Sequence, residues 1–339
     1  MLRLPRFRVE RPTTAAEAVR LAAEFGPGRA MYLAGGTDLV PNLKHRLFEP
    51  EVVVALDRVD ELRGIRHDED ATLVGAMTSL TAVAEDAELS QRFPALAQAA
   101  GVVSGPQLRN MGTLGGNLML DTRCRWYNQS HFWRQALGYC LKKDGTVCHV
   151  VAGGSKCVAA ASNDTAPALM TLDAEAVFLG TEGERTVPVA ELWQADGVWN
   201  KKVAPTELLT AIRIPRTAPG HRGAYGKLRE RGSIDFPLFG VAVRLDLDGD
   251  VVAAAAVAAV GLQARPIFVR KADEPLLGIR IGTAEFENAA RESARRAHKQ
   301  CIPMPNVPGD ADYRREMVPV FTRRTLLAAA SAGGPVLAR

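Results

Sequence analysis

Four of the five cysteines in this chain lie between residues 124 and 157. They are Cys124, Cys140, Cys148 and Cys157, with the spacing C-x15-C-x7-C-x8-C. Structural zinc sites usually place cysteines in pairs two to four residues apart, and this spacing has no such pair. Iron–sulfur clusters are commonly held by four thiolates. The spacing therefore favours a cluster, with a zinc site and plain buried thiols as the alternatives.

The residues around these cysteines are rich in positive charge. Between residues 124 and 157 there are five lysines and arginines and a single acid, Asp144. Four thiolates on a [4Fe–4S] core carry a net negative charge, which a basic wrapping would offset when the cluster is buried. A solvated loop face is the alternative. We interpret His131 and His149 as loop residues rather than ligands, and Cys301 as an ordinary thiol.

Two glycine-rich segments precede the cysteines. LAGGTDL (33–39) follows a predicted strand, and TLGGN (113–117) follows a predicted helix and loop. Glycine allows the backbone to approach a ligand closely, and successive N–H groups in such a turn can bind an anion. Neither segment is a Rossmann fingerprint or a Walker loop. The pair predicts a diphosphate held from two sides in another kind of site, with simple tight turns as the alternative.

Short strands and helices alternate along the chain, which predicts a mixed α+β or α/β architecture. Thr14 and Glu17 have the spacing of a capping box at the start of the first helix. Strands are expected at 29–35, 51–56, 71–77 and 207–215, a helix leading into a strand at 167–180, a hairpin at 237–262, and helices at 13–25, 79–89, 93–103, 284–298 and 312–330. Pro319 is expected to kink or interrupt the last helix.

The composition excludes several classes of protein. The chain has 339 residues, 47% apolar and 24% charged, which is typical of a soluble protein with two or three folding units. A net charge of +4 gives no argument for nucleic acid. The first residues do not resemble a secretory signal, and the longest apolar run (251–262) is too short to cross a bilayer. We therefore expect a cytoplasmic protein without nucleic-acid or membrane partners.

Several motifs resemble, in order, the FAD-binding medium subunits of the xanthine oxidase family of molybdenum enzymes. They are YLAGGTDL (32–39), NMGTLGGN (110–117), SNDTAPALMTLDAEAV (162–177), ELLTAIRIP (207–215), YGKLRERGSIDFP (225–237) and DYRREM (312–317). The resemblance implies an FAD-binding PCMH-type fold of two α/β subdomains, residues 1–56 and 57–218. A C-terminal α+β domain (223–330) would follow, with a three-stranded sheet and helices, as in carbon monoxide dehydrogenase flavoproteins.

The resemblance also implies which residues contact FAD. They are Tyr32, Leu33, Ala34, Gly35, Gly36, Thr37, Asp38 and Leu39 in the first loop, Thr113, Gly115, Gly116 and Asn117 in the second, and Asp164, Leu209 and Lys227 elsewhere. Without the resemblance, the alternative for Asp164 is an N-cap before a helix, and Lys227 reads as a surface cation.

Most such subunits lack residues 122–158. An insertion with four cysteines at this place resembles the β subunits of 4-hydroxybenzoyl-CoA reductases, and implies a [4Fe–4S] cluster on the four cysteines named above. It further implies a role in aromatic compound degradation. A large subunit would hold the molybdenum cofactor and a small subunit two [2Fe–2S] clusters, in a dimer of heterotrimers.

In that enzyme a ferredoxin-type donor would reduce the [4Fe–4S] cluster. Electrons would pass to FAD, to the [2Fe–2S] clusters and to molybdenum, where 4-hydroxybenzoyl-CoA becomes benzoyl-CoA. No catalytic residue is expected in this chain. Two other functions stay open: the FAD subunit of a related molybdenum hydroxylase acting on another aromatic or CoA-thioester substrate, and a zinc-stabilised nucleotide-binding scaffold without a redox role.

Overall fold

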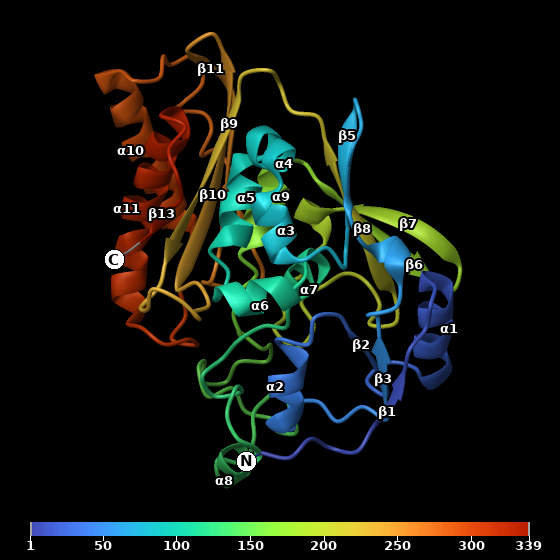
Figure 1. The fold of residues 1–339 in the computed structure, drawn as a ribbon. Helices are drawn as coiled ribbons and strands as arrows, with labels where there is room; N and C mark the ends of the chain where they lie inside the picture. The colour runs from blue at the N-terminus through green and yellow to red at the C-terminus, as the bar shows by residue number, and fades with distance from the viewer. Residues whose placement is uncertain (1, 338–339) are drawn as a thin grey trace.

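The computed structural model describes residues 2–337, which form three β-sheets and the helices that cover them (Figure 1). The strands are β1 (Arg8–Glu10), β2 (Ala30–Leu33), β3 (Val52–Ala55), β4 (Ile65–His67), β5 (Ala71–Gly75), β6 (Glu175–Gly180), β7 (Gly183–Pro188), β8 (Leu208–Pro215), β9 (His221–Leu228), β10 (Phe239–Asp248), β11 (Val251–Val260), β12 (Ile267–Phe268) and β13 (Val336–Leu337). The helices are α1 (Ala15–Phe25), α2 (Leu39–Lys44), α3 (Leu80–Glu85), α4 (Ala87–Arg92), α5 (Pro94–Gly101), α6 (Pro106–Met111), α7 (Leu114–Leu118), α8 (His131–Ala136), α9 (Thr165–Thr171), α10 (Ala284–Gln300) and α11 (Ala311–Ala330).

The first sheet is parallel, with the strand order β1-β3-β2, and packs against α1. The predicted cap of α1 is present: the Thr14 hydroxyl accepts a hydrogen bond from the Glu17 N–H at 3.2 Å. The Glu17 carboxylate in turn accepts from the N–H of Thr13 at 3.0 Å. Because the edge strand β2 ends at Leu33, the first glycine loop begins at the C-terminal end of this strand.

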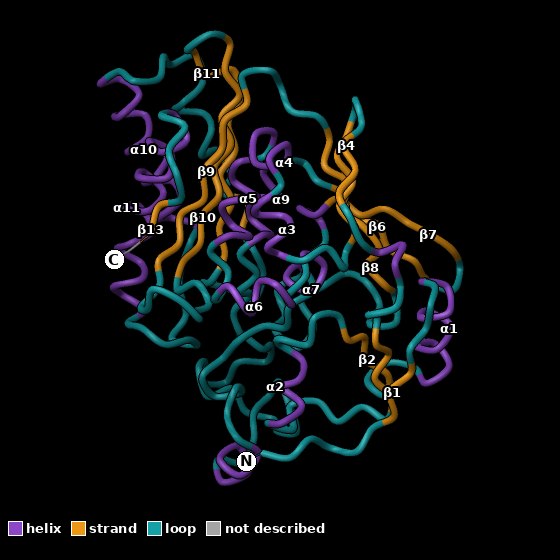
Figure 2. The backbone as a smooth tube through the Cα atoms, viewed as in Figure 1, coloured by secondary structure: helices purple, strands orange, loops and turns teal. Residues whose placement is uncertain are grey.

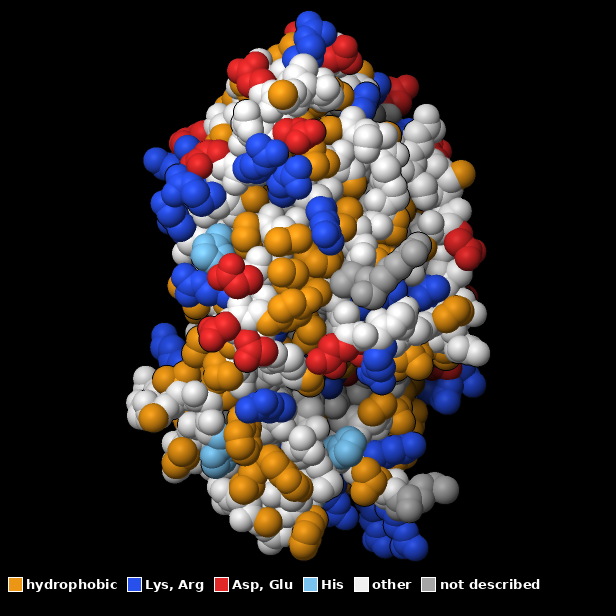
Figure 3. Space-filling model, turned by 90° about the vertical axis from the view of Figure 1, so that its left-hand side faces the viewer, with side chains coloured by type: hydrophobic (Ala, Val, Ile, Leu, Met, Phe, Trp, Pro, Cys, Tyr) orange, Lys and Arg blue, Asp and Glu red, His pale blue; other side chains and the backbone are white. Residues whose placement is uncertain are grey.

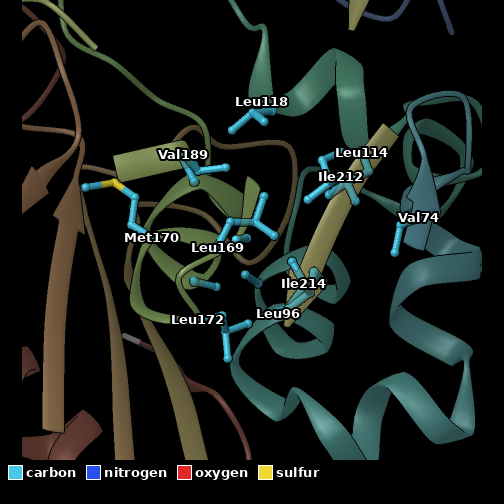
Figure 4. Close-up of a cluster of buried hydrophobic side chains, with 14 of the residues drawn as sticks. Val74, Leu96, Leu114, Leu118, Leu169, Met170, Leu172, Val189, Ile212 and Ile214 are labelled. Atoms are coloured by element: carbon cyan, nitrogen blue, oxygen red, sulfur yellow. The ribbon is translucent and has the colours of Figure 1, made fainter. Parts of the chain in front are cut away.

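The second sheet is antiparallel, with the order β4-β5-β8-β6-β7. Apolar side chains of the helices beside it meet those of the sheet in one core, where Leu96 of α5, Leu169 of α9 and Ile212 of β8 lie together (Figure 4). The helix predicted over 79–89 is two helices, because the Asp86 carboxylate accepts a hydrogen bond from the Leu89 N–H at 2.7 Å and starts α4.

The third sheet has the order β12-β11-β10-β9-β13. Its three long strands match the three-stranded sheet that the resemblance implied, although β9 was not among the strands predicted from local patterns. Two-residue strands extend the sheet at both edges. Helices α10 and α11 lie on one side of this sheet, and α5 and α9 on the other (Figure 1). Cover on both faces explains why residues 239–243 of β10 and 257–260 of β11 are all buried and carry no charged side chain. The hairpin of these two strands was predicted.

Helix α11 continues through Pro319, where the sequence predicted a kink or an interruption. It packs along α10, β9 and β10. This packing stabilises the helix on both sides of the position where proline removes one backbone hydrogen bond.

On the side of the molecule formed by α10 and α11, basic and acidic side chains are interspersed (Figure 3). Within residues 2–337, no helix combines the length and the apolar character that a membrane crossing requires.

The cysteine-bearing segment is mostly loop, with α8 as its one described helix, and it lies beside α2 (Figure 2). A pair of backbone hydrogen bonds between Arg123 and Ala160, both 2.7 Å, closes the base of this segment. The limits of the three predicted units (1–56, 57–218 and 223–330) stay a prediction.

Candidate functional site

The two glycine loops lie against each other, although they are far apart in the sequence. A Cβ atom on Gly35 would lie 1.7 Å from the carbonyl oxygen of Met111, so only glycine permits this contact. A Cβ atom on Gly116 would lie 3.8 Å from the Cβ of Ala34. The structure therefore brings the two predicted loops into one site.

The first loop offers backbone donors. No backbone carbonyl among residues 2–337 accepts a hydrogen bond from the N–H groups of Gly35, Gly36, Thr37 or Asp38. Gly36 has a φ of +72°, a left-handed conformation that glycine adopts without strain. Successive free N–H groups in such a turn form a hollow for an anion, and the pyrophosphate of a dinucleotide fits this chemistry.

Most backbone N–H groups of the second loop already donate to acceptors elsewhere in the protein or within the loop. The N–H groups of Leu114 and Gly115 donate to the carbonyls of Thr78 and Ala76, both at 2.9 Å. The N–H of Gly116 donates to the Thr113 hydroxyl at 3.0 Å. The two loops are therefore not equivalent. The first loop has backbone N–H groups available for a ligand, whereas the second loop is fixed in place by its own hydrogen bonds and packs beside the first.

Two buried groups of hydrogen bonds lie between the second loop and the third sheet. The Asn117 side-chain oxygen accepts from the N–H and the hydroxyl of Thr165 at 3.1 and 2.7 Å. The neighbouring Asp164 accepts from the Tyr225 hydroxyl at 2.8 Å and from Lys227 Nζ at 2.9 Å. Asn117, Asp164 and Lys227, predicted separately, thus belong to two buried hydrogen-bonded groups that meet at the adjacent residues Asp164 and Thr165.

Asp164 and Lys227 form an ion pair inside the protein, with exposed fractions of 2% and 0%. Burial raises the pKa of Asp164, and the ammonium group of Lys227 opposes that rise. Asp164 precedes α9, but its carboxylate makes no capping hydrogen bond there. The pair instead ties α9 to β9, and so holds the third sheet against the glycine loops.

Two other predicted FAD contacts, Leu209 and Tyr32, interact with the rest of the protein. Leu209 is buried in the core around β8. The Tyr32 hydroxyl donates to the carbonyl of Thr206 at 2.7 Å, and burial raises the pKa of Tyr32. Leu209 is therefore closed off from solvent, whereas Tyr32 is half-buried.

We predict that Gly35→Ala weakens FAD binding. The added methyl group must push the first loop away from Met111. Such overpacking costs about 1–3 kcal/mol, roughly a factor of ten to a hundred in the dissociation constant of FAD. Flavin fluorescence titration measures this constant. Gly334→Ala is the matched control, because a Cβ atom there meets nothing within 4 Å. Equal affinity of both variants would contradict the loop contact.

The four clustered cysteines line one pocket, together with Trp126, Tyr127, Leu141, Lys142, His149, Val150, Val158 and Ala159. Cys124, Cys140 and Cys157 are buried, and Cys148 is half-buried. Two sulfurs accept backbone hydrogen bonds: Val151 N–H donates to Cys148 Sγ and Ala159 N–H to Cys157 Sγ, both at 3.4 Å. Within residues 2–337, no three His, Cys, Asp or Glu side chains form a group that could hold a single metal ion.

One lysine lines the cysteine pocket, and a buried arginine lies in α8 of the same segment. The lysine is Lys142, which donates to Asp121 at 2.7 Å and to the Gly197 carbonyl at 2.6 Å. Burial raises the pKa of Cys157 to about 11, and Lys142 opposes the rise. Arg134 is 2% exposed, and its Nε and Nη1 atoms have no partner among the described residues. A buried cation without a carboxylate partner favours an anion nearby.

Lys201, fully buried near this pocket, predicts a pH effect on stability. Burial lowers the pKa of Lys201 to about 8 from a usual value of 10.5. The unfolded chain therefore binds more protons between these pH values, so the penalty of burying the charge falls as the pH rises. Relative to Lys201→Met, the wild-type free energy of unfolding should rise by about 2 kcal/mol between pH 7.5 and pH 10. Urea unfolding at both pH values measures this; a constant difference would contradict it.

Sequence reasoning missed the two arginines that connect the sites. Arg123 pairs with Asp38 of the first glycine loop, and its guanidinium lies 4.4 Å from the ring centre of Phe236. Arg134 donates to the backbone carbonyls of His45 and Arg46. No sequence pattern pointed to these contacts, because the partners lie 85 or more positions away and include backbone atoms.

Two family matches cover almost the whole chain. Residues 5–217 match the FAD-binding domain in molybdopterin dehydrogenase. Residues 224–329 match the CO dehydrogenase flavoprotein C-terminal domain. The architecture is therefore the expected PCMH-type FAD-binding fold followed by this C-terminal domain, and the observed sheets agree with it.

Individual relatives agree over similar lengths. The carbon monoxide dehydrogenase medium chain of Hydrogenophaga pseudoflava is 29% identical over 325 residues, 96% of this chain and 97% of the relative. The aldehyde oxidoreductase FAD-binding subunit PaoB of Escherichia coli is 30% identical over 286 residues, 80% and 86% of the two chains.

A solved structure of carbon monoxide dehydrogenase from Hydrogenophaga pseudoflava, in a form that lacks the Mo-pyranopterin moiety, superposes with a TM-score of 0.79. It shares 28% identity and covers 98% of this chain and 100% of that one. The glycine loops, the sheets and both family matches lead to one conclusion: the chain belongs to the FAD-binding medium subunits of the xanthine oxidase family of molybdenum enzymes.

Proposed function

We propose that this chain is an electron-transfer subunit with two redox groups, FAD at the paired glycine loops and a [4Fe–4S] cluster at the four-cysteine pocket. The observation that supports the cluster assignment is the shared pocket of the four cysteines. Cys124, Cys140, Cys148 and Cys157 come from separate turns of a loop segment and yet line one cavity. Four thiolates are the usual ligand set of such a cluster.

The surroundings of the pocket fit an anionic cluster. Lys142 lines the pocket, the buried Arg134 of the same segment keeps its Nε and Nη1 atoms unpaired among the described residues, and backbone N–H groups donate to two of the sulfurs. Hydrogen bonds to the sulfurs tune the potential of a cluster. A Cβ atom on Gly197 would lie 2.9 Å from Cys157 Sγ, so glycine allows the chain to pass close to this sulfur.

For FAD, we propose that the free N–H groups of the first loop bind the pyrophosphate from one side, and that Asn117 of the second loop lies on the opposite side of the pyrophosphate. We propose that the remaining residues of 32–39, together with Thr113, Gly115 and Gly116, form the rest of the FAD site. Asp164, Leu209 and Lys227 are buried and act by positioning it. When bound, FAD exchanges one or two electrons, whereas clusters pass them singly.

For the whole enzyme we propose the reductive dehydroxylation of 4-hydroxybenzoyl-CoA. Two electrons and two protons convert this substrate to benzoyl-CoA and water. A low-potential, ferredoxin-type donor supplies the electrons. The resemblance of the four-cysteine segment to 4-hydroxybenzoyl-CoA reductases supports this substrate. This chain contributes electron transfer and no acid or base.

A second candidate is the FAD subunit of a related molybdenum hydroxylase, acting on another aromatic or a CoA thioester. The names of similar proteins favour it, because they include a carbon monoxide dehydrogenase, a nicotinate dehydrogenase and a 6-hydroxypseudooxynicotine dehydrogenase. Electrons would then leave the molybdenum centre through this subunit.

We propose that the partners are a large molybdenum-cofactor subunit and a small [2Fe–2S] subunit, assembled as a dimer of heterotrimers. Support comes from relatives that are named as the medium chain or as one subunit of a complex.

Purification without oxygen tests the cofactors and the reaction. The isolated chain should contain about four irons per FAD and show an iron–sulfur shoulder beside the flavin absorption. Zinc in place of iron, in a colourless protein, would support the scaffold alternative instead. The complete complex, given reduced ferredoxin and 4-hydroxybenzoyl-CoA, should form benzoyl-CoA, detected by chromatography. A complex that contains iron and FAD but forms none would favour the hydroxylase.

A further inference from the structure

Helix α2 lies between the two candidate cofactor sites. Its first residue, Leu39, is the last residue of the first glycine loop. After its last residue, Lys44, the chain continues into Leu47 and Phe48, which pack with the cysteines of the pocket. One short segment, residues 35–48, therefore carries the free donors at one end and part of the cysteine cluster's packing at the other.

The beginning of α2 is held by Arg123, the residue immediately before Cys124. Its guanidinium pairs with Asp38, and its Nη1 lies 3.4 Å from the Asn42 side-chain oxygen. Asn42 also donates to Asp38 at 3.0 Å. The carboxylate of Asp38 lies in the loop that offers donors to an anion, so Arg123 removes a negative charge that would repel a pyrophosphate.

The end of α2 is held by Arg134, which belongs to α8 of the cysteine segment. Its Nη2 donates to the carbonyls of His45 and Arg46 at 3.0 and 2.9 Å. These are carbonyl groups at the helix C-terminus, where no further helical turn can satisfy them. Leu47, 1% exposed, packs beside Cys124 and Cys140 in the same apolar cluster.

We propose that the cysteine pocket and the flavin loop are thermodynamically coupled through α2, with Arg123 and Arg134 as the positioning residues. This inference rests on the proposed function, because it requires a cluster in the pocket. Metal binding supplies folding free energy to a segment that has little regular structure of its own. The ordered segment holds both arginines in place, and these hold residues 35–46 in the conformation that binds FAD.

Coupling of this kind is reciprocal. Removing the cluster should weaken FAD binding about tenfold, within the range typical of coupled sites, and FAD should slow the loss of iron to a chelator. Loss of either arginine contact should reduce this ratio towards one, even when iron is retained.

The test measures the FAD dissociation constant of the full-length chain by flavin fluorescence, first with iron and then after its removal by an iron chelator and a mild oxidant. The expected result is about a tenfold ratio in the wild type and about one in Arg134→Met. Arg185→Met is the matched control, because Arg185 lies in β7, the edge strand of the second sheet, where it pairs with Glu207 and not with α2. Its ratio should equal that of the wild type.

A second pair of variants tests the other end of α2 without relying on Arg134→Met. Arg123→Gln should weaken FAD binding by leaving Asp38 uncompensated, and Arg123→Gln with Asp38→Asn should restore part of the affinity. A merely structural role of Arg123 would not give this rescue.

Three outcomes overturn the inference. An FAD dissociation constant that is the same with and without iron overturns the coupling and leaves the cluster assignment intact. A wild-type ratio that persists unchanged in Arg134→Met and in Arg123→Gln overturns the route through α2. A wild-type chain that binds FAD but never contains iron overturns the cluster assignment and this inference together.

Discussion

Cys140→Ser should strip the chain of most of its iron, from about four atoms to fewer than one, when the protein is prepared without oxygen. Cys140 is buried in the pocket lining, and a serine hydroxyl does not ionise near neutral pH to replace the thiolate. Iron analysis and the visible spectrum measure the loss. Saturating FAD should still bind, because the donors of the first loop stay in place, although with the lower affinity that coupling through α2 predicts.

Cys301→Ala is the matched control for this experiment. Cys301 is also a buried thiol, and burial raises its pKa to about 12, but it packs in the core of the third sheet and does not line the pocket. Its replacement should leave the iron content unchanged. Full iron in Cys140→Ser, or equal losses in both variants, would remove the case for a cluster at this pocket.

The second large effect is expected for Lys227→Met, which should lower the free energy of unfolding by about 3–5 kcal/mol. The substitution leaves the carboxylate of Asp164 buried with the Tyr225 hydroxyl but without its cation. It also removes the donor to the Val102 carbonyl, which Lys227 contacts at 3.1 Å. Urea unfolding in the presence of saturating FAD measures the change.

The pH dependence of this variant follows from the same pair. Burial already raises the pKa of Asp164, and losing Lys227 removes the main opposing influence. An acid whose pKa is raised by folding destabilises the native state once it is ionised, and the penalty is relieved as the pH falls and the group is protonated. The deficit of Lys227→Met relative to wild type should therefore shrink between pH 7 and pH 5.

Two further variants complete the Lys227 experiment. Adding Asp164→Asn to Lys227→Met should recover part of the lost stability, because no buried charge remains. Arg185→Met removes one partner of an ion pair in which Arg185 is 45% exposed, and should cost less than about 1 kcal/mol. If Lys227→Met lowers the free energy of unfolding no more than Arg185→Met does, the ion pair between Asp164 and Lys227 does not stabilise the folded chain.

Local sequence patterns were sufficient for most of the regular structure. The Thr14 cap, the strands β2 and β3, and the hairpin of β10 and β11 all follow from residues within a few positions of one another, although only β3 is fully buried as predicted. The split at Asp86 and the continuous helix at Pro319 differ from prediction for two reasons. A capping carboxylate started a new helix in the first case, and packing from distant strands supported the helix in the second.

The sequence by itself determined the chemical inventory: four cysteines within one segment, five lysines and arginines around them, and two glycine-rich turns. Only the tertiary structure decided how these groups are used. It left the N–H groups of Gly35 to Asp38 free of backbone acceptors, whereas the N–H groups of Leu114 to Asn117 in the second loop donate within the protein. It also buried Asp164 with Lys227, and joined Arg123 and Arg134 to the two ends of α2. The physical reason is that hydrogen-bond and ion-pair partners are chosen by packing between distant segments, which local patterning does not encode.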